Sequence, residues 1–169
     1  MSDSSSICLS CLLCCDGTLI GFVQLEQEEI PPLKALLDIK EDSNGSGVFL
    51  HPCNNLCAEG CTIYDDRPKQ CRTFNCGLLK SVEQKEIAFD SAVEIINEVK
   101  QKKNTIEKQL IHLNIKLKSP SFYFKMVELK KLLKRFPTEE NTTPNHLTLI
   151  SNIENLEIIL PAKFGVSPF

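Results

Sequence analysis

The sequence of 169 residues has no tryptophan, only three histidines, and no cysteine after residue 76. With so few histidines, and no Ser/His/Asp or Cys/His arrangement, a hydrolase has little support. No glycine-rich loop that could cradle phosphates is present, so a nucleotide-binding enzyme has little support either. The sequence therefore favours a non-catalytic protein and leaves the question of catalysis open.

Long apolar runs are also missing. No stretch approaches the roughly 20 apolar residues of a membrane-spanning helix, so we expect no transmembrane segment. The residues after Met1, SDSSS, have no Lys or Arg and do not resemble a secretion signal. We expect a cytoplasmic protein, in which disulfides seldom persist. The odd number of cysteines, nine, also argues against a complete set of disulfides.

Charge of one sign is not in excess over the whole chain, because the formal net charge is only −3. It is unevenly spread, however: residues 80–135 carry 13 Lys and Arg against 7 Asp and Glu, and residues 1–79 carry 5 against 11. A basic amphipathic helix can bind nucleic acid or an acidic membrane surface. Acidic residues are interspersed and no aromatic platform accompanies the lysines, so a solvated face is favoured. We expect no nucleic-acid partner, and contact with a membrane surface is a weaker alternative.

What the sequence has in quantity is cysteine, and only in its first half. The nine candidate metal ligands are Cys8, Cys11, Cys14, Cys15, Cys53, Cys57, Cys61, Cys71 and Cys76. A structural zinc site usually has four ligands, so nine thiols could supply two such sites with one left over, or a cluster with bridging sulfurs. Thiolate-only sets suit zinc and iron alike. Zinc is favoured, and an iron or iron–sulfur centre is the alternative.

The stretch CLSCLLCC contains two overlapping Cys-x-x-Cys spacings and a neighbouring pair, Cys14 and Cys15. On a helix Cys14 would be rotated by about 100° from Cys15, and on a strand the two would point to opposite sides. The pair therefore favours two metals, or a bridged cluster, over one simple site. His51, close to Cys53, could replace a sulfur, although a surface position is favoured for it.

The local patterns predict an irregular first half with little regular structure. Residues 18–25 are typical of a short strand, residues 26–40 of a short helix, and residues 41–47 of a loop. Residues 48–79 are irregular, with prolines and glycines as punctuation. Metal crosslinks would explain how such a segment stays folded.

The second half is predicted to be helical. Apolar residues recur at helical spacing over residues 80–117, as one helix or as two with a break near KKNT. A second helix is expected with Ser119 as its N-cap, Pro120 in its first position, and an apolar stripe running to Phe136. A third begins at Thr143 and Pro144, buries Leu149, Ile153, Leu156 and Leu160, and ends at Pro161. We predict an α+β, mostly α fold: a cysteine-cluster module over residues 1–79 and an α-helical part over residues 80–169, packed on it or forming one compact unit with it.

The segment CTIYDDRPKQCRTF, after the N-terminal cysteine stretch, resembles the YkgJ-type cysteine-cluster family of zinc- or iron-chelating proteins. The similarity covers about residues 8–79, through Cys8, Cys11, Cys14 and Cys15 and then Cys61, Ile63, Tyr64, Arg67, Pro68, Cys71, Arg72 and Phe74. One position departs from the family pattern: Val48 stands where many members have a cysteine. The resemblance leaves open whether Cys53 or Cys57 takes its place.

The sequence therefore predicts a metal-binding protein in a structural or accessory role. An iron-dependent redox or electron-transfer protein is the first alternative, and metal sensing or delivery is the second. A protein partner is expected to contact the helical part.

Overall fold

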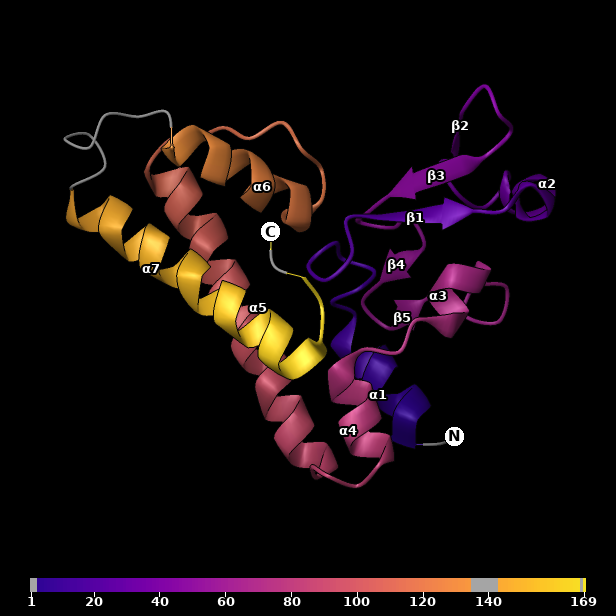
Figure 1. The fold of residues 1–169 in the computed structure, drawn as a ribbon, viewed down its shortest axis with the longest axis horizontal. Helices are drawn as coiled ribbons and strands as arrows, with labels where there is room; N and C mark the ends of the chain where they lie inside the picture. The colour runs from indigo at the N-terminus through magenta and orange to yellow at the C-terminus, as the bar shows by residue number, and fades with distance from the viewer. Residues whose placement is uncertain (1–2, 135–142, 168) are drawn as a thin grey trace. The chain divides into compact units, whose positions relative to one another are not determined.

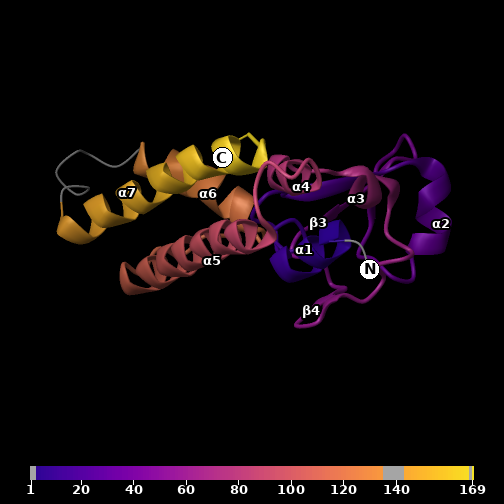
Figure 2. The same ribbon diagram turned by 90° about the horizontal axis from the view of Figure 1, so that it is seen from below.

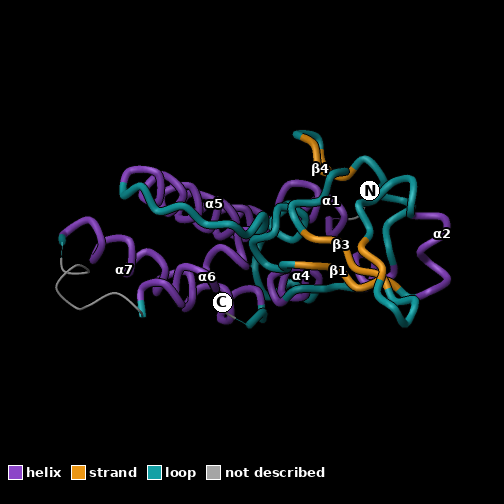
Figure 3. The backbone as a smooth tube through the Cα atoms, turned by 90° about the horizontal axis from the view of Figure 1, so that it is seen from above, coloured by secondary structure: helices purple, strands orange, loops and turns teal. Residues whose placement is uncertain are grey.

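The computed structural model describes residues 3–134, 143–167 and 169. Within these residues the chain is α+β and mostly helical, as the sequence predicted. It divides into two compact units, one built from the residues up to Asn75 together with Pro120–Tyr123, the other from Cys76–Ser119 and Phe124–Phe169. Figure 3 shows that short strands and long loops make up much of the first unit, whereas helices dominate the second.

The first unit begins with helix α1 (Asp3–Cys11) and then forms a small antiparallel sheet (Figure 1). The sheet has the order β1 (Phe22–Leu25), β3 (Gly47–Leu50), β2 (Lys40–Glu41). In β1 the alternate residues Val23 and Leu25 are buried, while Phe22 and Gln24 face solvent. The predicted strand at residues 18–25 is therefore four residues shorter at its start, because Thr18 and Leu19 donate hydrogen bonds to the Leu13 carbonyl instead.

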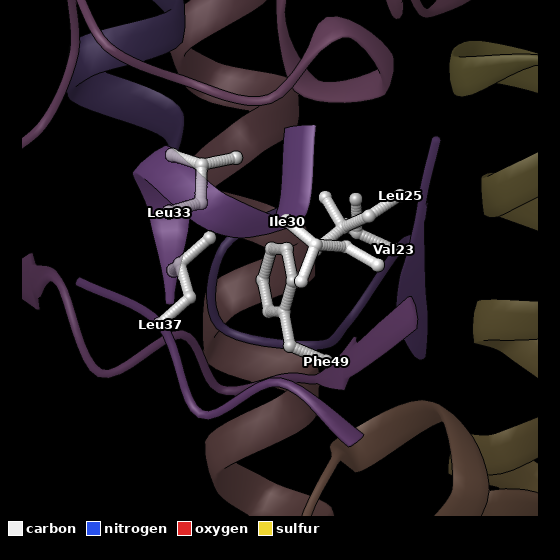
Figure 4. Packing of buried hydrophobic residues seen from close by; sticks show 6 residues of the cluster. All are labelled: Val23, Leu25, Ile30, Leu33, Leu37 and Phe49. Atoms are coloured by element: carbon white, nitrogen blue, oxygen red, sulfur yellow. The ribbon is translucent and has the colours of Figure 1, made fainter. Parts of the chain in front are cut away.

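The predicted helix at residues 26–40 is reduced to two short turns. Helix η1 (Gln27–Glu29) is a 3₁₀ turn, and α2 (Ile30–Leu33) follows it. These turns bring Ile30 and Leu33 over the sheet. Figure 4 shows their side chains gathered with those of Val23, Leu25, Leu37 and Phe49, which together form the hydrophobic core of this unit.

The predicted loop at residues 41–47 is a tight turn that joins β2 to β3, a hairpin that the sequence pattern did not reveal. The Asp42 carboxylate accepts hydrogen bonds from the backbone N–H groups of Asn44 and Ser46, each at 2.9 Å. The predicted irregular segment contains a second hairpin, β4 (Leu56–Cys57) with β5 (Gly60–Cys61), and the one-turn helix α3 (Lys69–Thr73).

The second unit contains α4 (Gly77–Glu83), α5 (Phe89–His112), most of α6 (Phe122–Leu133), α7 (Pro144–Ile159) and the π-helical turn η3 (Leu160–Phe164). Figures 1 and 2 show α5 and α7 side by side. Their facing residues are buried, including the whole α7 stripe that the sequence predicted. Helix α5 has no break at KKNT: the helical pattern is interrupted earlier, where Lys85 takes a positive φ of 58°.

Three predicted helix ends are wrong for identifiable reasons. Helix α5 stops at His112 because Asn114 takes a left-handed conformation, with φ 53°. Helix α6 begins at Phe122, and Ser119 instead bonds the Glu128 carboxylate through its backbone N–H and its hydroxyl. Pro161 does not end the last helix. The turn continues through it to Phe164, which is buried, and stops at Gly165 with φ 64°.

The α7 start matches its prediction, since the Thr143 hydroxyl accepts a hydrogen bond from the His146 N–H and Pro144 is the first helical residue. Phe136, at the end of the predicted α6 stripe, lies outside the described residues. Among the helices that the structure describes, none is both long and apolar enough to cross a membrane.

Candidate metal centre

The first four cysteines are divided by the end of α1. Cys8 and Cys11 lie on the helix, which stops at Cys11 because Leu12 takes a left-handed φ of 60°. A compact turn follows, in which the Gly17 N–H donates to the Cys14 carbonyl at 3.2 Å and the Leu13 side chain is fully buried. Cys14 and Cys15 therefore lie on a packed turn outside the helix.

Cys53 is held directly against this turn. Its backbone N–H donates to the Cys15 carbonyl at 2.9 Å, although 38 positions separate the two residues in the sequence. Its side chain packs against the edge of the hydrophobic core, as does that of Cys71. Two cysteines from distant parts of the chain thus share one face of the same core.

The β4–β5 hairpin supplies Cys57 and Cys61, on opposite strands. Cys61 pairs with Leu56, and Cys57 pairs with Gly60. Gly60 has φ 126°, and a Cβ there would lie 3.0 Å from the Leu9 side chain of α1. The glycine therefore allows the hairpin to approach the helix that carries Cys8 and Cys11.

Cys71 lies on α3, which is tied to the rest of the first unit by side chains. The Glu29 carboxylate accepts from the Lys69 backbone N–H at 2.6 Å, and the Lys69 ammonium forms an ion pair with Glu26 at 2.5 Å. The Gln70 side-chain oxygen accepts from the Gln24 N–H of β1 at 2.7 Å. These bonds fix the helix turn on which Cys71 is presented.

The thiols of Cys15, Cys53, Cys61 and Cys71 interact electrostatically, and we call these four residues the coupled thiols. The pKa of Cys15 is raised to about 12, chiefly by burial and in addition by the neighbouring Cys61, Cys71 and Cys53. Burial likewise raises the pKa of Cys71 to about 12, again with contributions from Cys53 and Cys61. Without a metal, the Cys15 and Cys71 thiols are therefore neutral at physiological pH.

Arg67 is a cation that acts on this set through Cys71. It opposes the rise in the Cys71 pKa, because a positive charge favours the thiolate. Its guanidinium carbon lies 3.4 Å from the centroid of the Tyr64 ring, and its Nε donates to the Tyr64 carbonyl at 2.6 Å. The IYDDRP segment therefore holds a positive charge beside a cysteine, whereas the charge of Lys69 is directed to Glu26.

Four of the nine predicted ligands thus lie near enough to one another to interact electrostatically. Cys57 hydrogen-bonds Glu59, and this bond lowers the pKa of that carboxyl. Cys76 belongs to the second unit, where its sulfur accepts the Leu79 N–H at the start of α4, at 3.4 Å. All nine cysteines are free thiols. Among the described residues, no three Cys, His, Asp or Glu side chains already stand at the spacing of metal ligands.

His51 is a residue that the sequence analysis placed wrongly. A surface position was favoured for it, but its side chain is only 2% exposed and lies edge-on to the Phe49 ring at 5.5 Å. Burial lowers its pKa, a hydrogen bond to the Cys15 backbone opposes this, and the imidazole is therefore neutral at physiological pH. The two-residue period of β3 is the signal that could have found it, because Gly47 and Phe49 are buried and His51 is the next position on the same face.

Comparison with known proteins now adds to this geometry. Residues 7–109 match the model of the CxxCxxCC family, described as a "putative zinc- or iron-chelating domain". The chain belongs to this family. No curated protein and no solved structure matches it.

Membership of the CxxCxxCC family confirms the resemblance drawn from the two cysteine blocks. The match extends further than the expected residues 8–79, since it includes α4 and most of α5. The family description supports a zinc or iron ion as the cofactor and does not decide between the two metals.

Proposed function

We propose that the protein holds a zinc ion through the thiolates of the coupled thiols, in a structural or accessory role. The observation that carries this proposal is that the Cys53 N–H bonds the Cys15 carbonyl and that Cys53, Cys61 and Cys71 all act on the pKa of Cys15 within the first unit. Four sulfur donors form a ligand set suited to zinc. Holding Cys15 and Cys71 where burial and neighbouring cysteines raise their pKa to about 12 has no evident benefit for a metal-free protein.

The chemistry of the donors fits the ion, although their spacing is not yet that of bound ligands. A divalent cation would replace the four thiol protons, and its charge would stabilise the four thiolates. The protein supplies neighbouring donors, a partly desolvated position at the edge of the core, and the positive charge of Arg67. Metal binding would crosslink the turn after α1, the segment after β3, β5 and α3, and so stabilise a unit with a small core.

The remaining cysteines divide into two groups. Cys8, Cys11, Cys14 and Cys57 stay candidate ligands of a second site or of a bridged cluster. Their location on α1, on the turn that follows it and on the adjacent hairpin supports this grouping. We propose that Cys76 is the thiol left over, because its sulfur already accepts a backbone N–H at the start of α4.

Elemental analysis and an absorption spectrum of protein purified without oxygen test the proposal. We expect bound zinc and no visible absorption. Replacing any one coupled thiol by serine should lower the metal content, whereas Cys76→Ser should leave it unchanged and serves as the matched control. A folded protein that contains no metal when it is purified without oxygen, with all nine thiols free, would refute the proposal.

Two alternatives are distinguished by the same measurements. A brown protein with visible charge-transfer bands would support an iron or iron–sulfur centre with a redox role. Metal sensing or delivery is favoured by one observation: all nine thiols are only half-buried, so an incoming chelator can reach them. Rapid exchange of bound zinc with an isotope in solution would support that role over a structural one.

We propose a protein partner for the helical part and no nucleic-acid partner. The expected protein partner of the helical part has one supporting feature, the exposed apolar side chains Ile111, Leu147 and Ile158. Nucleic acid is disfavoured further, because Lys130 of the basic segment already pairs with Glu157. We propose that the protein shows no retardation of nucleic acid even at low salt, where such attraction is strongest.

A further inference from the structure

The buried polar residues of the first unit are gathered at one place, next to Cys15. Among the described residues, the buried polar or charged side chains are those of Thr18, His51 and Ser121. All three adjoin Gly17. Thr18 follows it directly, and a Cβ placed on Gly17 would lie 3.1 Å from the Cβ of His51 and 2.8 Å from that of Ser121. The cluster therefore surrounds the turn that carries Cys15.

This turn is fixed from two sides by segments distant in sequence. On one side, the Tyr123 N–H donates to the Gly17 carbonyl at 2.7 Å, and Pro120–Tyr123 belongs to the first unit. On the other side, the Cys53 N–H and the His51 imidazole both engage the Cys15 backbone. The Cys15 main chain is thus held by the same segment that carries Cys53.

The cluster would destabilise the core if its role were purely structural. The Nδ1 atom of His51 and the Oγ1 atom of Thr18 are buried without a hydrogen-bond partner among the described residues. Each such atom destabilises the folded state, and an apolar side chain of similar shape would avoid that loss. Retaining a histidine here makes physical sense if its contact with Cys15 serves another purpose.

We propose that His51 is a positioning residue of the metal centre. Its imidazole, held between Phe49 and the Gly17 turn, fixes the Cys15 backbone so that the Cys15 thiol faces Cys53, Cys61 and Cys71. This inference rests on the proposed metal-binding function. Residues behind metal ligands act in this way by orienting the ligand, and their replacement typically lowers metal affinity by about 10–100-fold.

The test compares two replacements of similar size and shape in the full chain. His51→Asn keeps hydrogen-bonding groups, whereas His51→Leu is apolar. Cobalt(II) is titrated into reduced, metal-free protein without oxygen, and the thiolate-to-cobalt absorption bands report both affinity and ligand geometry. We expect His51→Leu to weaken cobalt binding by about 10–100-fold and to alter the bands. His51→Asn should recover most of the affinity, and His112→Leu, at an exposed position on α5, is the control.

Thermal unfolding of the metal-free variants separates positioning from a structural role. Our proposal requires His51→Leu to unfold near the wild-type temperature while its cobalt bands change. Unchanged bands and affinity in His51→Leu would overturn it, and so would an affinity loss that merely follows a loss of metal-free stability. If His51→Leu does not fold, His51→Phe takes its place, and failure of both to fold counts against the proposal. A wild-type protein that binds neither cobalt nor zinc would instead refute the proposed function.

Discussion

The stability of the metal-free protein should fall as the pH rises above about 9, because two of the coupled thiols are held protonated by the fold. The pKa of Cys15 and that of Cys71 are raised from 9.0 to about 12. In this range the unfolded chain releases protons that the folded chain retains, so ionisation favours unfolding. Well below pH 9.0, the ordinary pKa of a thiol, the folded and the unfolded chain both hold these protons. The two thiols then do not lower the free energy of unfolding.

The size of the effect follows from the proton difference. Each thiol that is ionised only in the unfolded state lowers stability by about 1.4 kcal/mol per pH unit. Between about pH 8 and pH 10, the free energy of unfolding should therefore fall by about 1 kcal/mol for each thiol, and by about 2–3 kcal/mol for Cys15 and Cys71 together. Urea unfolding of reduced, metal-free protein, followed by circular dichroism at several pH values, measures this slope.

The double variant Cys15→Ser/Cys71→Ser isolates these thiols from other groups that titrate in the same range. Its stability should depend on pH less steeply than that of the wild type, whereas Cys57→Ser, on the hairpin, should retain the full slope. Bound zinc should reverse the sign of this pH dependence. The bound thiolates must be protonated before the metal is released, so the stability of the zinc-bound protein falls as the pH is lowered. An unchanged slope in the double variant would show that the two thiols are not held protonated by the fold.

Two further variants test the scaffold of the site. Glu29→Gln weakens charge-assisted bonds to the backbone N–H groups of Glu26 and Lys69, so chemical denaturation should show a loss of about 1–2 kcal/mol, with Glu28→Gln as the control. Phe49→Ala removes a buried ring from the core beneath Cys53 and Cys71, and the free energy of unfolding should fall by about 3–5 kcal/mol in the metal-free protein. A loss below about 1 kcal/mol would show that this core does not support the first unit.

Residues with a regular apolar period were predictable from the sequence. The α7 stripe, from Leu149 to Leu160, is buried as expected, and its start is capped by Thr143. Periodicity reports which side of a helix is apolar, and the packing in the second unit follows it. The ends of helices were less predictable, because a single left-handed residue such as Asn114 or a buried Phe164 beyond a proline decides them.

The candidate ligands of the proposed metal centre can be listed from the sequence, but their grouping in space cannot. Cysteine spacing identified nine candidates and the family to which the chain belongs, but spacing along the chain does not report which thiols meet in space. That Cys15 lies beside Cys53 depends on one backbone hydrogen bond, and Cys71 is positioned by bonds from Glu29 and Gln24. Such long-range contacts leave no local pattern in the sequence.

The neighbouring residues Cys14 and Cys15 illustrate how spacing along the chain differs from proximity in space. Had α1 continued through residue 15, Cys8, Cys11 and Cys15 would have shared one face, at i, i+3 and i+7. Because Leu12 ends the helix, Cys15 instead follows the turn toward Cys53, and its pKa is influenced by Cys53, Cys61 and Cys71. A single left-handed residue therefore decides which cysteines Cys15 approaches, and spacing along the chain does not report it.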